Sequence, residues 1–261
     1  MFHVIDNINL DNRMPKTRMI KMEGAMNFRD LGGIQLKGNS LTRNGVLFRS
    51  DGLSRLTVRD LKKFESLKIN SVLDLRHSEE IAKAPDKLPR DMTVQSINCG
   101  FYAKGTMKLF QAVNSGKADV RESKSLMRQV YAKMPIEHIE EIQKIIRYVL
   151  QSEKTPCLIH CMSGKDRTGL IIAIILKAIG APMPAIISDY EMSNGEYQTV
   201  DVFDEGAQQE SITAVMAADP SYLLASFAAI EKVYGSFDNY ITKALMLTDS
   251  ELNQLSHVLS E

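Results

Sequence analysis

The stretch LIHCMSGKDRTGLII, residues 158–172, joins an apolar strand-like run to an apolar helical run through a short polar loop. The first run ends at His160 and Cys161, five residues follow, and Arg167 begins the helical pattern. A thiol at a helix N-terminus faces the positive end of the helix dipole, and Lys165 and Arg167 add cationic neighbours. All three influences favour the thiolate, so the pattern predicts a nucleophilic cysteine at neutral pH.

The segment between the cysteine and the arginine has the length and composition of an oxyanion-binding turn. Five residues suffice to wrap backbone N–H groups around one tetrahedral anion, and Gly164 lets the backbone approach closely. The planar fork of Arg167 can hold two phosphate oxygens at once. We expect His160 to hold the loop through its ring nitrogens and Thr168 to donate a hydrogen bond to the thiolate. The expected phosphate-binding residues are Met162, Ser163, Gly164, Lys165, Asp166 and Arg167.

Each of these residues alone has a simpler interpretation, as a small core thiol or part of a solvated charged turn. The complete string His-Cys-x5-Arg-Thr-Gly gives every residue a distinct task and favours a phosphate loop, the name used below for residues 160–169.

Composition sets broad limits on the function. Lysine plus arginine and aspartate plus glutamate number 32 each in 261 residues, so no overall charge favours nucleic acid or a membrane surface. The three cysteines form no CxxC pair and no zinc-like cluster with histidine, so we expect neither a metal nor another cofactor. Residues 1–22 form a polar leader without a signal-peptide core, and the longest apolar run, residues 170–176, is too short for a transmembrane segment. We expect a cytoplasmic protein, although a chain that had lost an export signal would look the same. The oligomeric state is not indicated.

The remaining pattern predicts one α/β domain over residues 1–261, with a central, mainly parallel sheet flanked by helices. Turn signals at Gly32-Gly33 and Asn44-Gly45 separate short early strands. Helical spacing and buried strand-like runs then alternate, and most of the chain after residue 183 has helical spacing, including the stretch 220–241. The expected later elements are a helix at 57–69, strands at 71–75 and 93–100, helices at 108–134 (interrupted by Ser-Gly) and 136–153, and a helix at 167–179.

Five motifs occur in order along the chain: NFRDLGG (27–33), LFRSDGLSRL (47–56), VLDLR (72–76), HCMSGKDRTG (160–169) and DYEMSN (189–194). Together they resemble a bacterial family of cysteine-dependent tyrosine phosphatases that includes secreted mycobacterial and listerial proteins. The resemblance implies a cysteine-phosphatase-like fold and a cysteinyl-phosphate intermediate on Cys161. It also implies activity on phosphotyrosine, with several members acting on phosphoinositides or phosphoserine and phosphothreonine. A helical lid is implied at about residues 200–229, which could exclude water, shield the thiolate or be a fixed part of the fold.

The reaction needs a general acid, and two aspartates compete for that role. Asp74 ends a predicted buried strand, and the carboxyl ends of parallel strands share one edge of a sheet with Cys161. The DLR motif of the family matches Asp74, which we favour, although its simpler role is to pair with Arg76. Asp166 competes because it lies inside the phosphate loop. The chain has no tryptophan, so it lacks the Trp-Pro-Asp loop of classical tyrosine phosphatases.

Lys165 bears on the substrate. The string GKDRTG resembles the loops of tensin-type and myotubularin-type lipid phosphatases, and an added cation suits a polyanionic head group; the simpler interpretation is that Lys165 offsets Asp166. We expect a protein tyrosine phosphatase with phosphorylated proteins or peptides as partners, extending to phosphoserine, phosphothreonine and phosphoinositides. The alternatives are a lipid or inositol phosphate phosphatase with incidental tyrosine activity, and a phosphate-binding module without turnover.

Four charged or polar residues of the first two motifs, Arg29, Asp30, Arg49 and Ser50, receive no predicted chemistry. Cys99 is interpreted as a free core thiol, with a protective disulfide to Cys161 as the alternative.

Overall fold

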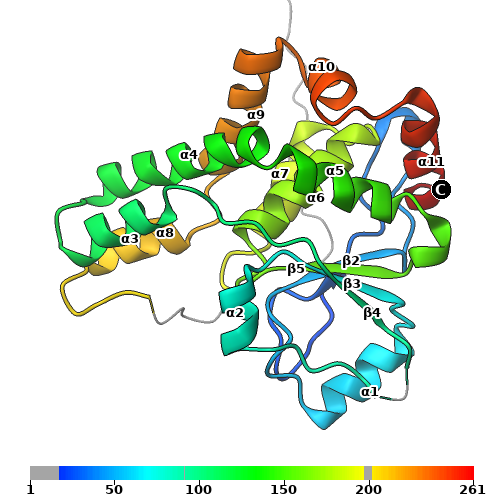
Figure 1. Ribbon diagram of the computed structural model, residues 1–261, viewed down its shortest axis with the longest axis horizontal. Coiled ribbons are helices and arrows are strands. Elements are labelled where there is room, and N and C mark those ends of the chain that lie inside the picture. Colours follow the sequence, from blue (N-terminus) through cyan, green and yellow to red (C-terminus); the bar gives the residue numbers. More distant parts are fainter. Residues whose placement is uncertain (1–17, 91, 197–201) are drawn as a thin grey trace, which may run out of the picture.

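The computed structural model describes residues 18–90, 92–196 and 202–261 and contains a five-stranded sheet in the order β1-β2-β5-β3-β4 (Figure 1). The strands are β1 (Arg29–Asp30), β2 (Leu47–Ser50), β3 (Ser71–Asp74), β4 (Gln95–Asn98) and β5 (Cys157–His160). Only β1 runs antiparallel to its neighbour, β2, and the other pairs are parallel. The predicted α/β class with a mainly parallel sheet is therefore confirmed.

The register of the three central strands makes their carboxyl ends level. On one side of β5, Ser50 of β2 pairs with His160, and on the other side Asp74 of β3 pairs with the same residue. Cys161 follows immediately, so it leaves the sheet at the centre of this edge. Ligand sites of open α/β sheets form at such an edge.

Alternate strand residues face two separate cores, as a pleated sheet requires. Phe48, Val72 and Leu158 point to a small core that Phe64 of α1 (Val58–Ser66) completes. The adjacent strand residues point to a larger core. This core lies between the sheet and the helices drawn above it in Figure 1. Thr57 caps α1 by accepting a hydrogen bond from the backbone N–H of Asp60. Because β3 and β5 are buried on both faces, their central residues, Val72-Leu73 and Leu158-Ile159, are apolar without alternation.

The larger layer is built on α6 (Asp166–Ala178), which is buried from Thr168 to Leu176. Such a helix is apolar on all sides because sheet and helices enclose it completely. It begins one residue before Arg167, the predicted first residue. The surrounding helices are α2 (Ser78–Lys83), α3 (Thr106–Asn114), α4 (Val120–Glu137), α5 (Ile139–Val149), α7 (Met183–Glu191), α8 (Gln209–Met216), α9 (Pro220–Tyr234), α10 (Phe237–Asn239) and α11 (Asp249–Leu259); the short turns are η2 (Lys37–Asn39), η3 (Ser152–Lys154) and the π-helical η4 (Tyr240–Ala244).

The C-terminal helices differ from the predicted pattern at Gly235. This residue has a φ of +81° and caps α9, so the apolar stretch continues as α10 and η4 instead of one long helix. The predicted lid corresponds to α8 and α9, and α9 buries Tyr222, Leu223 and Phe227. Residues 1–17 of the leader and residues 200 and 201 of the lid lie outside the described residues, and opening of the lid stays a prediction.

Among the described residues, no single helix is long and apolar enough to cross a membrane. Taken together, α8 and α9 have the length and composition of a membrane-spanning segment, but the chain is bent by 53° between them.

Candidate active site

The phosphate loop is pressed against the end of β2. Gly164 has a φ of +66°, and a Cβ atom there would lie 2.3 Å from the carbonyl oxygen of Ser50. Glycine is therefore required at this position by both conformation and space. The thiol residue Cys161 is only 2% exposed, whereas the next residue, Met162, is 37% exposed. The nucleophile thus lies at the base of the loop and Met162 at its outer side.

Arg167 is held by Glu80 of α2 along one edge of its guanidinium. Its Nη1 and Nη2 atoms each donate to one carboxylate oxygen of Glu80 at 2.6 Å, and Nη1 also donates to the carbonyl of Leu75 at 3.0 Å. Within the described part of the chain, the Nε–H and the second Nη2–H have no partner. These two groups form a parallel fork that matches two phosphate oxygens.

The charge of Arg167 is secure at any relevant pH. Burial by itself lowers the pKa of its guanidinium, but the hydrogen bonds to Glu80 and the nearby Cys161 and Glu80 charges raise it above its ordinary value. The pKa of Glu80 is lowered, because its pairing with Arg167 outweighs the effect of burial.

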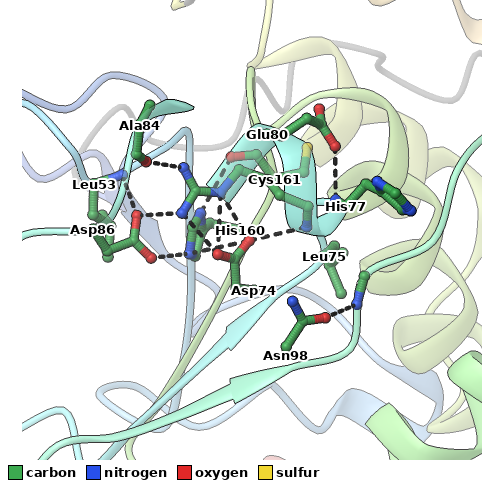
Figure 2. Close-up of polar contacts among 12 residues, drawn as sticks. Leu53, Asp74, Leu75, His77, Glu80, Ala84, Asp86, Asn98, His160 and Cys161 are labelled. Atoms are coloured by element: carbon green, nitrogen blue, oxygen red, sulfur yellow. Dashed lines mark hydrogen bonds and ion pairs between the residues drawn. The ribbon is translucent and has the colours of Figure 1, made fainter. Parts of the chain in front are cut away.

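His160 lies between the loop and a buried pair of carboxylates, as Figure 2 shows. Its Nδ1 is 3.2 Å from the carbonyl oxygen of Cys161, and its Nε2 is 3.0 Å from Oδ2 of Asp86. Burial raises the pKa of Asp86, but the hydrogen bond and charge of His160 and the charge of Arg76 lower it overall. Asp86 therefore holds the ring that contacts the backbone of the nucleophile.

Asp74, the favoured general acid, is bound on both oxygens by Arg76. The Nε of Arg76 donates to Oδ1 at 2.9 Å and its Nη2 to Oδ2 at 2.7 Å. The same Nη2 lies 2.7 Å from Asp86. Asp74 is buried at the expected sheet edge, but its two oxygens are directed to this guanidinium.

A metal ion could in principle be held by Asp74, Asp86 and His160, whose ligand atoms all lie within 4.8 Å of one another. The guanidinium of Arg76 already lies between the two carboxylates and donates a hydrogen bond to each. The donor set therefore fits an internal ion pair better than a metal site.

Asp166, the competing acid, is on the loop itself and more accessible. Its side chain is 33% exposed, and its Oδ1 accepts a hydrogen bond from the hydroxyl of Tyr131 at 2.7 Å. The Tyr131 hydroxyl also lies 2.7 Å from that of Tyr190. Burial first, and then the charge of Asp166, raises the pKa of Tyr131 well above its ordinary value, so this phenol stays a donor.

Lys165 is buried, and its ammonium is directed to the end of α8. Its Nζ donates to the carbonyls of Val215 at 2.7 Å and Ala217 at 3.3 Å and lies 3.4 Å from Oδ1 of Asp166. Burial lowers the pKa of Lys165. In this arrangement the predicted substrate cation connects the phosphate loop to the segment predicted as the lid.

The structure brings the predicted loop residues together, but two expected contacts stay predictions. The hydroxyl of Thr168 is buried and finds no partner among the described residues, and no disulfide joins Cys99, Cys157 and Cys161, which are all buried free thiols. Burial raises the pKa of Cys99 and brings that of Cys157 to about 12, so both thiols are poor nucleophiles.

Sequence reasoning missed the acidic partners of the site, Glu80 and Asp86. Both lie in a charged segment after the DLR motif that has the composition of an ordinary solvated turn. The one available signal was that a buried arginine after a nucleophile needs a carboxylate partner.

Comparison with known proteins agrees with this geometry. The model of the tyrosine phosphatase family matches residues 20–261. A putative tyrosine-protein phosphatase of Cupriavidus necator is 28% identical over 87% of this chain and 84% of its own length. The triple specificity protein phosphatase PtpB of Mycobacterium tuberculosis is 27% identical over 92% of this chain and 98% of its own length. The chain belongs to the tyrosine phosphatase family, as the motifs predicted, and is therefore a phosphomonoester hydrolase.

The solved structures that match this chain have lower sequence identity to it. The catalytic domain of the PP-IP phosphatase SIW14 from S. cerevisiae gives a TM-score of 0.38 at 17% identity, covering 76% of this chain and 89% of that one. TpbA of P. aeruginosa gives a TM-score of 0.33 at 18% identity, covering 78% of this chain and 96% of that one.

Proposed function

We propose that this protein hydrolyses phosphotyrosine through a cysteinyl-phosphate intermediate on Cys161. The observation that carries the proposal is the position of that thiol at the base of the phosphate loop, with Glu80 orienting Arg167. A buried sulfur followed by a ring of backbone N–H groups and an aligned guanidinium suits a tetrahedral dianion.

The reaction has two steps. Sγ of Cys161 attacks phosphorus, the bond from phosphorus to the tyrosyl oxygen breaks, and a carboxylic acid gives that oxygen its proton. Water then attacks phosphorus, its proton passes to the same carboxylate, and the P–S bond breaks to release phosphate and the thiolate. Arg167 holds the equatorial oxygens in both steps. We favour Asp166 over Asp74 as the proton donor, because the Asp166 carboxylate lies on the loop and is partly exposed, whereas both oxygens of the buried Asp74 are bound by Arg76.

The substrate range is proposed to be broader than phosphotyrosine. The name of the mycobacterial relative describes a triple specificity phosphatase, and this chain aligns with 98% of it. We propose phosphoserine and phosphothreonine peptides, and phosphoinositides, as further substrates. For Lys165 to serve as a second cation for a polyanionic head group, its ammonium would have to leave the carbonyls of Val215 and Ala217.

The test compares the wild type with Cys161→Ser on phosphotyrosine, phosphoserine and phosphothreonine peptides and on phosphoinositides, with a chelator present. We expect phosphate release by the wild type alone, with phosphotyrosine peptides ranked first. A clear preference for the lipids would favour the alternative of a lipid phosphatase. Equal release by the two proteins, or none by either, would refute the catalytic role of Cys161.

A further inference from the structure

A single carboxylate, that of Asp189 on α7, is surrounded by three buried arginines. Its oxygens lie 3.0 Å from Nη1 of Arg18, 3.1 Å from Nε of Arg29 and 2.7 Å from Nη1 of Arg49. Among the described residues no second carboxylate contacts these guanidiniums. Three buried cations that share one anion need further acceptors for their remaining N–H groups. We call these four residues the Asp189 cluster.

Some of the remaining N–H groups around Asp189 donate hydrogen bonds to the backbone of the phosphate loop. Nη2 of Arg49 donates to the carbonyl of Gly164 at 2.6 Å. Nδ2 of Asn27 donates to the same carbonyl at 3.0 Å and to that of Ser163 at 3.3 Å. Asn27 is itself held by Arg29, which donates to its side-chain oxygen. Two side chains from the first two sequence motifs therefore contact successive peptides of the loop.

These contacts determine the orientation of the peptides that follow. In a trans peptide the C=O and the N–H point in opposite directions. Because the Ser163 carbonyl accepts from Asn27 and the Gly164 carbonyl accepts from Asn27 and Arg49, the N–H groups of Gly164 and Lys165 are directed away from these side chains. Backbone N–H groups of this kind are the donors that bind a tetrahedral oxyanion.

Two members of the cluster, Arg29 and Asp189, keep their charges at neutral pH. Burial, reinforced by the charge of Arg49, lowers the pKa of Arg29 to about 10, which still leaves it protonated. Burial by itself raises the pKa of Asp189, but Arg29, Arg49 and Arg18 together hold it well below its usual range. Arg29 is therefore a permanent donor, and Asp189 a permanent acceptor, at neutral pH.

We propose that Arg49 and Asn27 are positioning residues that hold the phosphate loop in its anion-binding conformation through the carbonyls of Ser163 and Gly164. The inference rests on the proposed phosphatase function, since it assigns Arg49 and Asn27 a task in that site. A purely structural role, as a link between strands and α7, would require the contacts to Asp189 but not those to the loop.

The experiment measures alkylation of Cys161 by iodoacetate and by iodoacetamide, with the site of modification assigned by peptide fragmentation. The anionic reagent needs the loop donors, whereas the neutral reagent reports only access to the thiol. We expect the ratio of the iodoacetate rate to the iodoacetamide rate to fall about tenfold in Arg49→Met, because this variant loses one charge-assisted hydrogen bond to the loop. Asn27→Ala, which changes no charge, is expected to lower the ratio about threefold or more.

Arg18→Met is the matched control, because Arg18 contacts the same Asp189 carboxylate but donates no hydrogen bond to the loop. Its ratio is expected to stay near that of the wild type. Arg49→Lys, with the charge kept, serves if Arg49→Met does not fold by circular dichroism. Unchanged ratios in the Arg49 and Asn27 variants, or an equal fall in Arg18→Met, would overturn the proposal. Alkylation needs no turnover, so a wild type without phosphatase activity would sink the proposed function and leave this test valid.

Discussion

Glu80 and Arg167 are joined by two hydrogen bonds of 2.6 Å that occupy one edge of the guanidinium and leave the other edge open. The carboxylate thus acts on the phosphate through the arginine. Without it, Arg167 could rotate about its long side chain and lose the alignment of its remaining fork.

The first prediction follows from this pair. Glu80→Gln keeps the side-chain size but removes the charge, so kcat/KM for phosphotyrosine peptides is expected to fall about tenfold to a hundredfold. Steady-state kinetics measure the change. Glu79→Gln is the control, because Glu79 is exposed on the same helix and pairs with no described residue. If both variants behaved alike, Glu80 would have no positioning role.

A second prediction concerns Gly164. Gly164→Ala would force a positive φ and bring Cβ to 2.3 Å from the Ser50 carbonyl, so the loop must move. We expect more than a hundredfold loss of kcat/KM, an estimate of roughly 3 kcal/mol for lost oxyanion donors. Gly33→Ala is the comparison, since it has a φ of +74° with nothing within 4 Å of the added Cβ. That variant should lose only about 1 kcal/mol of stability and keep its kcat/KM. Full activity in Gly164→Ala would show that the loop tolerates the displacement.

Local patterns explain how much of this fold was predictable from the sequence. The strands β3 and β5 have apolar centres, and the helix α6 has a long apolar part. Tertiary packing does not override such strong local signals. The spacing from Cys161 to Arg167 similarly encodes the loop, because a peptide of that length closes around one anion.

The partners of the loop were not predictable, because they are distant in sequence. Arg49 and Asp189 are 140 residues apart and Asn27 and Gly164 are 137 apart, so no local periodicity relates them. As isolated charged residues they have the composition of a solvated turn, and only the folded sheet edge brings them together. The break at Gly235 was missed for a different reason, since apolar spacing continues through it and only the backbone conformation ends the helix.

A third prediction concerns the pH dependence of stability. Burial, which outweighs the hydrogen bond from the Met26 backbone and the nearby Arg55 and His160 charges, raises the pKa of Asp51 to about 7 from an ordinary value of 3.8. Between those pH values the folded state holds a proton that the unfolded state has lost, so stability falls as pH rises through this window. Asp51→Asn should remove this contribution and gain roughly 1–4 kcal/mol relative to the wild type at pH 8. Urea unfolding from pH 4 to pH 8 measures it, and an unchanged slope in the variant would contradict the assignment.

The last prediction separates the two candidate acids by leaving group. A proton donor matters most when the departing oxygen is strongly basic, so its removal harms phenyl phosphate more than p-nitrophenyl phosphate. Asp166→Asn is expected to lower kcat/KM, which reports the step that expels the leaving group, about 10²–10³-fold on phenyl phosphate and much less on p-nitrophenyl phosphate. Asp74→Asn leaves Arg76 with a weaker partner in a buried site, so it should lower the free energy of unfolding by about 3 kcal/mol and affect both substrates equally. The reverse pattern, a leaving-group effect in Asp74→Asn alone, would make Asp74 the acid and require its carboxylate to leave Arg76 during the reaction.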